Sequence, residues 1–340
     1  MLELDVLATE SAMAEEFLAG VERRYLPEKF FYWFPLSVKA WLDLCQEAGP
    51  YKNYGRSYQL ISKHAPEIAK RLGGSRVRVV SLGAGQGDKD LVILNAFREL
   101  GIEARYQPVD ASQSLVEMAL RQATEAGFPT RGLKADVANP QTFRALRSQE
   151  RTPRLYLLLG NTLGVTGPVD FLGSLSRLLR PQDRLLVDGE VFNPRATLAG
   201  YDNPLNRRFA FAPLASVGLE EGRHGELVFE TQNGKIPGLY FIAKHFRAAR
   251  PLRLLVAGHR LEFQPGEKIE MNSSCKYSPG VFPKLLRERG GFRLLREYLS
   301  DDEQFLMVLA APRSEPARRR AFRPAGLIRQ ARYGAGPAGK

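Results

Sequence analysis

The feature that most constrains the fold is an alternation of short apolar runs with amphipathic segments between residues 75 and 191. Such apolar runs predict strands, and the segments between them place apolar residues at helical spacing. Strands joined through helices of this length pair in parallel, because a right-handed crossover brings the next strand back in the same direction. Because the runs are apolar throughout, we expect both faces of the sheet to be buried. The expected strands are 75–82, 104–110, 130–136, 154–160 and 183–191, and the expected helices are 88–100, 112–127 and 168–179.

The regions flanking this alternation have a different pattern. The first 75 residues are expected to be helical, with apolar residues at helical spacing over 36–48 and 57–72. After residue 192 the alternation stops. The remaining expected elements are a helix over 203–222, two antiparallel neighbouring strands over 238–250 and 253–264, a helix over 279–290, and a closing strand pair over 292–300 and 303–311. These patterns predict an α/β fold: a Rossmann-like parallel sheet with antiparallel closing strands, plus a smaller α+β domain.

The charge of the chain is unevenly distributed. The 340 residues carry a net charge of +12. More than half of this excess lies between Arg313 and Lys340, in a segment rich in Pro, Gly and Ala. We interpret 313–340 as a flexible, solvated basic tail. An arm that binds nucleic acid is the alternative, because basic segments attract phosphate backbones.

Cysteine, histidine and hydropathy patterns exclude several classes of protein. Cys45 and Cys275 are far apart and form no disulfide framework, so we expect a reducing cytoplasm. No apolar run approaches the roughly 18 residues of a membrane span, and the N-terminus lacks the basic start and apolar core of a secretory signal. We expect no metal site, because the histidines have no ligand spacing: His64, His224, His245 and His259.

A glycine-rich turn follows the first strand of the alternation. Gly83, Gly85 and Gly87 stand before a helix, where free backbone amides can face a ligand. The dinucleotide-binding motif would place a further glycine at position 88, where this chain has Asp88. An acidic residue at a helix N-terminus repels a pyrophosphate. It suits a ligand with a cationic amino-acid end, such as S-adenosylmethionine.

The next two strands also end in acidic residues. Asp110 can accept hydrogen bonds from both hydroxyls of a ribose, since a carboxylate offers two acceptor oxygens. Asp136 is placed to accept from an adenine amino group. The alternatives are a helix N-cap for Asp110 and a turn residue for Asp136. Three consecutive strands that each end in a suitable group favour a cofactor site.

Four segments of the chain resemble a known family. They are SLGAGQGDKD (81–90), LLLGNTLG (157–164), AGYDNP (199–204) and GEKIEMNSSCKY (266–277). They resemble the histidine Nα-methyltransferase family of ergothioneine biosynthesis, which also includes N-methyltransferases of prenylated tryptophan. The chain looks like a divergent member, with similarity from about Pro27 to Ala311.

The resemblance implies a division into a cofactor domain and a substrate domain. The Rossmann-like cofactor domain is expected to cover 75–194 and to resume over 276–312. The substrate domain is expected to combine the N-terminal helices, 1–74, with an insertion, 195–275.

The same resemblance implies site residues, without assigning a catalytic residue. In the substrate pocket, Tyr32 and Tyr201 match tyrosines that surround the amino acid, and Ser274 is kept. Gly160 opens the loop between cofactor and substrate. The other positions expected to bind S-adenosylmethionine are Gly83, Ala84, Gly85, Lys89, Asp110, Ala111, Asp136 and Val137.

The expected substrate pocket departs from the family at two places. Val165 stands where the family has an asparagine that holds the amino-acid end of the substrate, and Asn272 stands where it has a glutamate that binds imidazole. The register of Tyr51 and Tyr54 with the family's tyrosine-rich turn is open. We therefore expect free histidine to be a poor acceptor, and the true acceptor to be a less polar or differently substituted amine.

The sequence thus predicts an S-adenosylmethionine-dependent N-methyltransferase acting on a small amino acid or related amine. Asp202 and Glu190 are candidates for the proton acceptor, although a structural role is favoured for each. One alternative is an RNA methyltransferase, but the segment Gly160–Gly164 lacks the Asn/Asp-Pro-Pro-aromatic motif of enzymes that methylate base amines. Another is a catalytically inactive, cofactor-binding partner subunit, which the intact glycine turn argues against.

Overall fold

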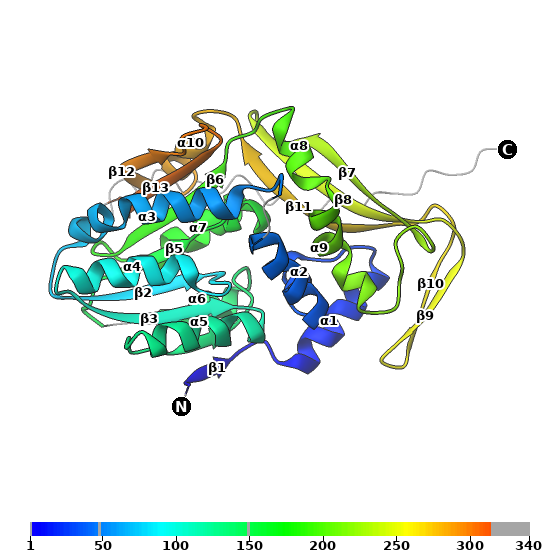
Figure 1. The fold of residues 1–340 in the computed structure, drawn as a ribbon, viewed down its shortest axis with the longest axis horizontal. Helices are drawn as coiled ribbons and strands as arrows, with labels where there is room; N and C mark the ends of the chain where they lie inside the picture. The colour runs from blue at the N-terminus through cyan, green and yellow to red at the C-terminus, as the bar shows by residue number, and fades with distance from the viewer. Residues whose placement is uncertain (1, 47–48, 148–149, 314–340) are drawn as a thin grey trace.

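A computed structural model describes residues 2–46, 49–147 and 150–313. Its centre is an eight-stranded sheet (Figure 1). The strands in spatial order are β1 (Leu4–Val6), β4 (Gly132–Lys134), β3 (Glu103–Asp110), β2 (Arg76–Leu82), β5 (Arg154–Leu158), β6 (Arg184–Glu190), β13 (Phe305–Pro312) and β12 (Phe292–Leu299). The first six are parallel, and β13 is antiparallel to both β6 and β12. The predicted parallel sheet with an antiparallel closing pair is confirmed.

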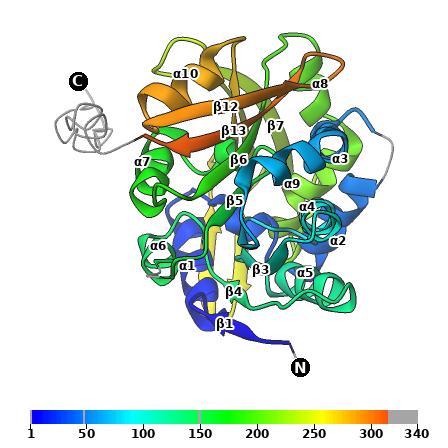
Figure 2. The same cartoon turned by 90° about the vertical axis from the view of Figure 1, so that its left-hand side faces the viewer.

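Helices cover both faces of this sheet, as Figure 2 shows. One face carries α3 (Asn53–Leu72), α4 (Asp88–Glu99) and α5 (Gln113–Glu125), and the other carries α6 (Pro140–Ala145), α7 (Pro168–Leu178) and α10 (Val281–Glu288). Along β2, Val77 and Val79 pack into the core under α3 and α4, while Val80 and Leu82 pack into the core on the α7 side. This two-sided burial explains the continuous apolar runs. No helix among the described residues is long and apolar enough to span a membrane.

A second body packs at the carboxyl ends of the parallel strands (Figure 1). Its apolar core combines N-terminal residues such as Phe17 and Phe30 with distant residues such as Phe211 and Phe246. Its helices are α1 (Glu10–Glu22), η1 (Glu28–Phe31), α2 (Pro35–Gln46), α8 (Ala196–Tyr201) and α9 (Pro204–Ala215). Its strands are β11 (Lys268–Tyr277), β8 (Leu239–Ala248) and β7 (Gly225–Asn233), in that spatial order, and a separate hairpin of β9 (Leu252–Val256) and β10 (His259–Phe263).

Two expectations about the regions that flank the alternation are wrong. The run 253–264 does not pair with 238–250, because β8 lies between β7 and β11. Ala257 and Gly258 have φ of 49° and 83° and form a two-residue turn, so the run folds back on itself. Two consecutive left-handed residues are typical of the tight turns that join hairpin strands. The N-terminal region is also not entirely helical, since β1 adds an edge strand to β4.

The strand order places a binding crevice at the glycine turn. The chain proceeds from β2 to β3 on one side and later returns to β5 on the other side of β2. Ligands of open α/β sheets bind outside the carboxyl ends of the strands at such a reversal of strand order. The second body faces this edge, so the two bodies together enclose the site.

Candidate active site

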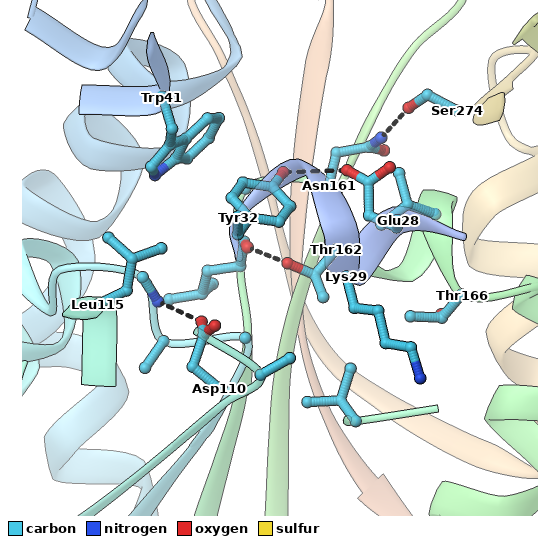
Figure 3. A pocket seen from close by; sticks show the side chains of 18 of the residues that line it. Glu28, Lys29, Tyr32, Trp41, Asp110, Leu115, Asn161, Thr162, Thr166 and Ser274 are labelled. Carbon is cyan, nitrogen blue, oxygen red and sulfur yellow. Dashed lines mark hydrogen bonds between the residues drawn. The ribbon is translucent and has the colours of Figure 1, made fainter. Parts of the chain in front are cut away.

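One continuous cavity of about 400 Å³ lies between the two bodies. Figure 3 shows its lining, with Asp110 and Leu115 on one side and Glu28 and Ser274 on another. All predicted cofactor residues and four of the five predicted substrate residues line it: Gly83, Ala84, Gly85, Lys89, Asp110, Ala111, Asp136, Val137, Gly160, Tyr32, Val165, Tyr201 and Ser274. The exception is Asn272, which is buried and does not line the cavity.

The glycine turn needs glycine for its backbone conformation. Gly83, Gly85 and Gly87 have φ of 72°, 57° and 90°, in the left-handed region that favours glycine. A Cβ at Gly87 would lie 2.9 Å from Ala119, so close packing of α4 on α5 also requires glycine there. A Cβ at Gly85 would meet only the Trp41 indole nitrogen, at 3.9 Å, and would otherwise project into open space. The backbone at Gly85 therefore faces room for a ligand.

Asp110 combines burial with free hydrogen-bonding capacity. Its two oxygens accept from the backbone amides of Gly85 at 3.0 Å and Ser112 at 2.9 Å. Burial raises the pKa of Asp110, while these amides oppose the shift. Each oxygen keeps a lone pair, so the carboxylate can accept two more donors, such as ribose hydroxyls. The N-cap of α5 is Ser112, so the N-cap alternative for Asp110 is wrong.

Two further carboxylates lie along the cofactor side of the cavity. Asp136 accepts from the amide of Ala138 at 2.9 Å, which is the turn role weighed as its alternative, and pairs with Lys29 of η1 at 3.1 Å. Asp88 accepts from the hydroxyl of Tyr54 at 2.6 Å and from the amides of Gln86 and Gln122 at 2.7 and 3.0 Å. All three partners of Asp88 are neutral, so its charge is available to a cationic group in the cavity.

The loop after β5 divides the cavity into two halves. The cofactor half is lined by the glycine turn, Asp110 and Asp136, and the acceptor half by Glu28, Tyr201 and Ser274. Asp188 of β6, fully buried, accepts from the backbone amides of Gly160 and Asn161 at 3.0 and 2.7 Å and from Ser57 at 2.5 Å. Asn161 has φ 63° and donates from its side chain to Ser274 at 3.1 Å (Figure 3). Asp188 thus fixes the loop conformation. Sequence reasoning did not identify this role, because it depends on a tertiary contact.

A buried ionic network forms the floor of the acceptor half. Lys276, fully buried, pairs with Glu190 at 2.8 Å and donates to Ser274 at 2.9 Å and to the Tyr201 hydroxyl. Glu190 also accepts from Asn53 at 2.6 Å. These partners agree with the structural role favoured for Glu190.

Several predictions around this floor are decided by the geometry. Asp202 pairs with Arg207 at 2.6 Å and does not line the cavity. Tyr51 packs edge-on against Tyr201, with ring centroids 5.5 Å apart. Tyr51 thus lies beside Tyr201, while Tyr54 binds Asp88 on the cofactor side; their register with the family's tyrosine-rich turn stays open.

Glu28 places a carboxylate beside Asn272, and the sequence analysis did not identify it. Its oxygens accept from the Tyr32 hydroxyl at 3.0 Å and from the Asn272 side-chain amide. Asn272 lies in a bulge of β11 with φ 59°, which turns its amide toward Glu28. Burial raises the pKa of Glu28, against the effect of the positive charge of Lys244. A carboxylate therefore lies beside Asn272, supplied by Glu28.

Lys244 is a further cavity residue that the sequence analysis did not identify. It lies on β8 and lines the cavity with 6% of its surface exposed. The residues two positions before and after it, Ile242 and Phe246, are fully buried. Strand periodicity therefore places a lysine in a row of core residues, a signal that sequence alone could have given.

The chain is similar in sequence to a family of known methyltransferases. A model of the family described as "Histidine-specific methyltransferase, SAM-dependent" matches residues 13–312. The histidine N-alpha-methyltransferase of Mycobacterium tuberculosis is 24% identical over 88% of this chain and 95% of its own length. That of Mycolicibacterium smegmatis is 26% identical over 84% and 91%. An S-adenosylmethionine-dependent methyltransferase of Clostridium acetobutylicum is similar with a TM-score of 0.43 and 12% identity, over 78% of this chain and 96% of that one.

These findings identify the cofactor and the class of reaction. No group of His, Cys, Asp and Glu in the described residues is placed to hold a metal ion. The chain is an enzyme that uses S-adenosylmethionine to methylate a nitrogen of an amino acid, and it belongs to the family of histidine-specific, S-adenosylmethionine-dependent methyltransferases.

Proposed function

We propose that this enzyme methylates the α-amino nitrogen of a free amino acid, in an acceptor pocket altered from that of its histidine-methylating relatives. The observation that carries the proposal is the single cavity that joins the glycine turn and Asp110 to the polar wall of Glu28, Tyr201 and Ser274. The relatives named histidine N-alpha-methyltransferase support the choice of the α-nitrogen.

The residues of the cofactor half fit S-adenosylmethionine. The open space at Gly85 admits the ligand close to the backbone, and Asp110 has lone pairs for the ribose. Asp136 and Val137 lie where they can bind adenine, and Asp88 offers a charge for the cationic amino-acid end. When bound, the cofactor supplies a methyl group on a sulfonium, so the protein's task is to align the acceptor and exclude water.

The acceptor half can hold an amino acid by its polar ends. Tyr51 and Tyr201 lie over the floor formed by Lys276, and Asn161 extends from the dividing loop toward Ser274. The shared core of α1, η1 and α2 with the 195–275 insertion supports assigning these segments to one substrate domain, whereas α3, within the expected 1–74 part, packs on the central sheet. The accepting amine must be unprotonated, because an ammonium has no lone pair.

Two differences define the altered pocket. The carboxylate comes from Glu28 on η1 instead of from position 272, and Val165 presents an apolar side chain to the cavity. Asn161 brings a side-chain amide from the start of the same loop. Within this proposal free histidine is a weak acceptor.

The test is a methyl-transfer assay with S-adenosylmethionine and each free amino acid, with release of S-adenosylhomocysteine as the readout. We expect turnover with at least one amino acid, and its loss in Asp110→Ala through weakened cofactor binding. An RNA pool is assayed in parallel. Methylation of RNA alone, or cofactor binding without turnover of any amino acid, would contradict the proposal.

We also propose a cytoplasmic location. Cys45 and Cys275 are both free thiols, and burial raises the pKa of each to about 12. Protonated, buried thiols suit a reducing compartment. The basic tail beyond Arg313 lies outside the described residues, and its role as a solvated segment stays a prediction.

A further inference from the structure

Lys244 carries a buried charge without a hydrogen-bond acceptor. Its side chain lines the cavity and its ammonium lies 4.6 Å from the centre of the Phe31 ring. Among the described residues, no carboxylate, carbonyl or hydroxyl oxygen accepts a hydrogen bond from it. A buried ammonium is costly unless it is paired, so this position favours a ligand that brings an oxygen.

Lys276, the second buried lysine near the site, differs from Lys244 in having partners for its ammonium. Lys276 has a carboxylate and two hydroxyls as partners: Glu190, Ser274 and Tyr201. Its interactions are complete without a ligand. Lys244, on the neighbouring strand β8, has no such partner among the described residues, and its side chain lines the cavity. The contrast points to ligand binding as the role of Lys244.

Glu28 is the counterpart of Lys244 on the cavity wall. Each of its oxygens accepts from one neutral donor, Tyr32 or Asn272, so each keeps a lone pair. The positive charge of Lys244 acts on Glu28, but no nitrogen–oxygen distance within 4.0 Å joins the two side chains. The cavity therefore has a cationic and an anionic group near each other and not in contact.

We propose that Lys244 and Glu28 together bind the tip of the acceptor's side chain, and that this tip is a neutral carboxamide-type group. Its N–H would donate to Glu28, and its carbonyl oxygen would accept from Lys244. This inference rests on the proposed function, because it assumes an amino acid in this half of the cavity.

Other side-chain classes satisfy only one of the two charges. A carboxylate would pair with Lys244 and be repelled by Glu28, while an ammonium or guanidinium would do the reverse. A hydrocarbon would leave both charges buried without a ligand partner, which is the condition under which polar sites discriminate most strongly. An amide satisfies both groups without adding a net charge.

Histidine fits this pair less well than an amide. An imidazole that donates to Glu28 is stabilised as imidazolium by the neighbouring carboxylate. The imidazolium has no lone pair for Lys244, and its positive charge lies beside Lys244 and Lys276. Histidine is therefore a weaker acceptor because of Lys244, and not because a carboxylate is missing.

The experiment compares side chains of similar length with different tips: glutamine, glutamate, methionine and lysine, with asparagine, citrulline and histidine added. For the wild type we expect kcat/KM for the best carboxamide or ureido amino acid to exceed that for the charged, apolar and imidazole ones by about 10- to 100-fold, as for a hydrogen bond to a charged group. Lys244→Met keeps the length of the side chain and removes the charge. In this variant the kcat/KM values for glutamine and for methionine should lie within about threefold of each other.

Two controls separate specificity from folding. Lys268→Met changes an exposed lysine on β11 and should leave the wild-type preference unchanged. S-adenosylmethionine affinity, measured by calorimetry, should stay at the wild-type value in Lys244→Met, because that residue lies in the other half of the cavity.

The outcomes are distinct. If the wild type prefers an acidic, basic, imidazole or apolar amino acid, or if Lys244→Met binds the cofactor normally and keeps the wild-type ranking, the inference is overturned while the proposed function stands. If no amino acid is methylated, the proposed function fails and the inference falls with it.

Discussion

The two halves of the cavity are built in different ways. The cofactor half comes from the ends of neighbouring parallel strands, within residues 83–162, and uses backbone amides and carboxylates that follow each strand directly. The acceptor half combines side chains from segments as distant as Glu28, Asn161, Lys244 and Ser274. The first half is therefore encoded locally in the chain, and the second exists only after the two bodies have packed together.

The halves also differ in how their charges are held. On the cofactor side, Asp110 and Asp88 are bound by neutral donors and keep capacity for a ligand. On the acceptor side, Glu190 and Lys276 neutralise each other in a buried pair. We expect changes in the first half to affect ligand affinity, and changes in the floor of the second to affect stability as well.

The largest effect is expected from Glu190→Gln. Removing this carboxylate leaves the fully buried Lys276 without its counterion, which typically costs about 3 to 5 kcal/mol of unfolding free energy. Chemical denaturation measures this loss. The double change Glu190→Gln with Lys276→Met should recover most of the stability, because no unpaired charge remains. A single variant as stable as the wild type would show that the pair does not support the floor.

Gly85→Val should weaken cofactor binding by about 100-fold, through strain of a β-branched residue at φ 57° and a side chain projecting into the cavity. Gly101→Val is a matched control, because Gly101 has φ 70°, has open space around it and does not line the cavity. Calorimetry with S-adenosylmethionine should show the loss for Gly85→Val only. Equal affinities in the two variants would remove the glycine turn from the cofactor site.

A smaller effect is expected from adding a carboxylate next to Glu28. Asn272→Glu places a second carboxylate against Glu28 and should lower kcat/KM for the accepted amino acid by about 10-fold. Adding Glu28→Gln removes the contact between like charges but should leave kcat/KM about 10-fold below the wild type, because the carboxylate is then at position 272, which does not line the cavity. If Asn272→Glu alone raises turnover, the contact between these side chains does not govern the pocket.

The smallest effect is expected from the C-terminal tail. A chain ending at Arg313 keeps the whole central sheet and should fold and methylate a small acceptor like the full chain. Thermal unfolding and kcat/KM measure this. A large, salt-dependent loss of RNA binding together with activity would instead indicate that the tail serves a nucleic-acid substrate.

The sequence predicted the fold, and the residues that it predicted to bind the cofactor all line the cavity. The pattern of apolar residues and the glycines of the turn define β2, the glycine turn and Asp110 within a short stretch of chain. The acceptor half was predicted only through resemblance, and Glu28 was missed because only the packed fold brings it next to Asn272, which is far away in the chain. Asp188 was overlooked because its role depends on a tertiary contact with the dividing loop. Lys244 could have been found from strand alternation alone, had the register of β8 been taken into account.

The most direct test of the central claim is the position of the transferred methyl group. The enzyme is supplied with S-adenosylmethionine carrying a ¹³C-labelled methyl and with its preferred amino acid, and the product is examined by NMR. We predict that the label appears on the α-nitrogen, because the two halves of one cavity align that atom with the cofactor. Label on a side-chain atom, or on RNA in place of the amino acid, would contradict the account.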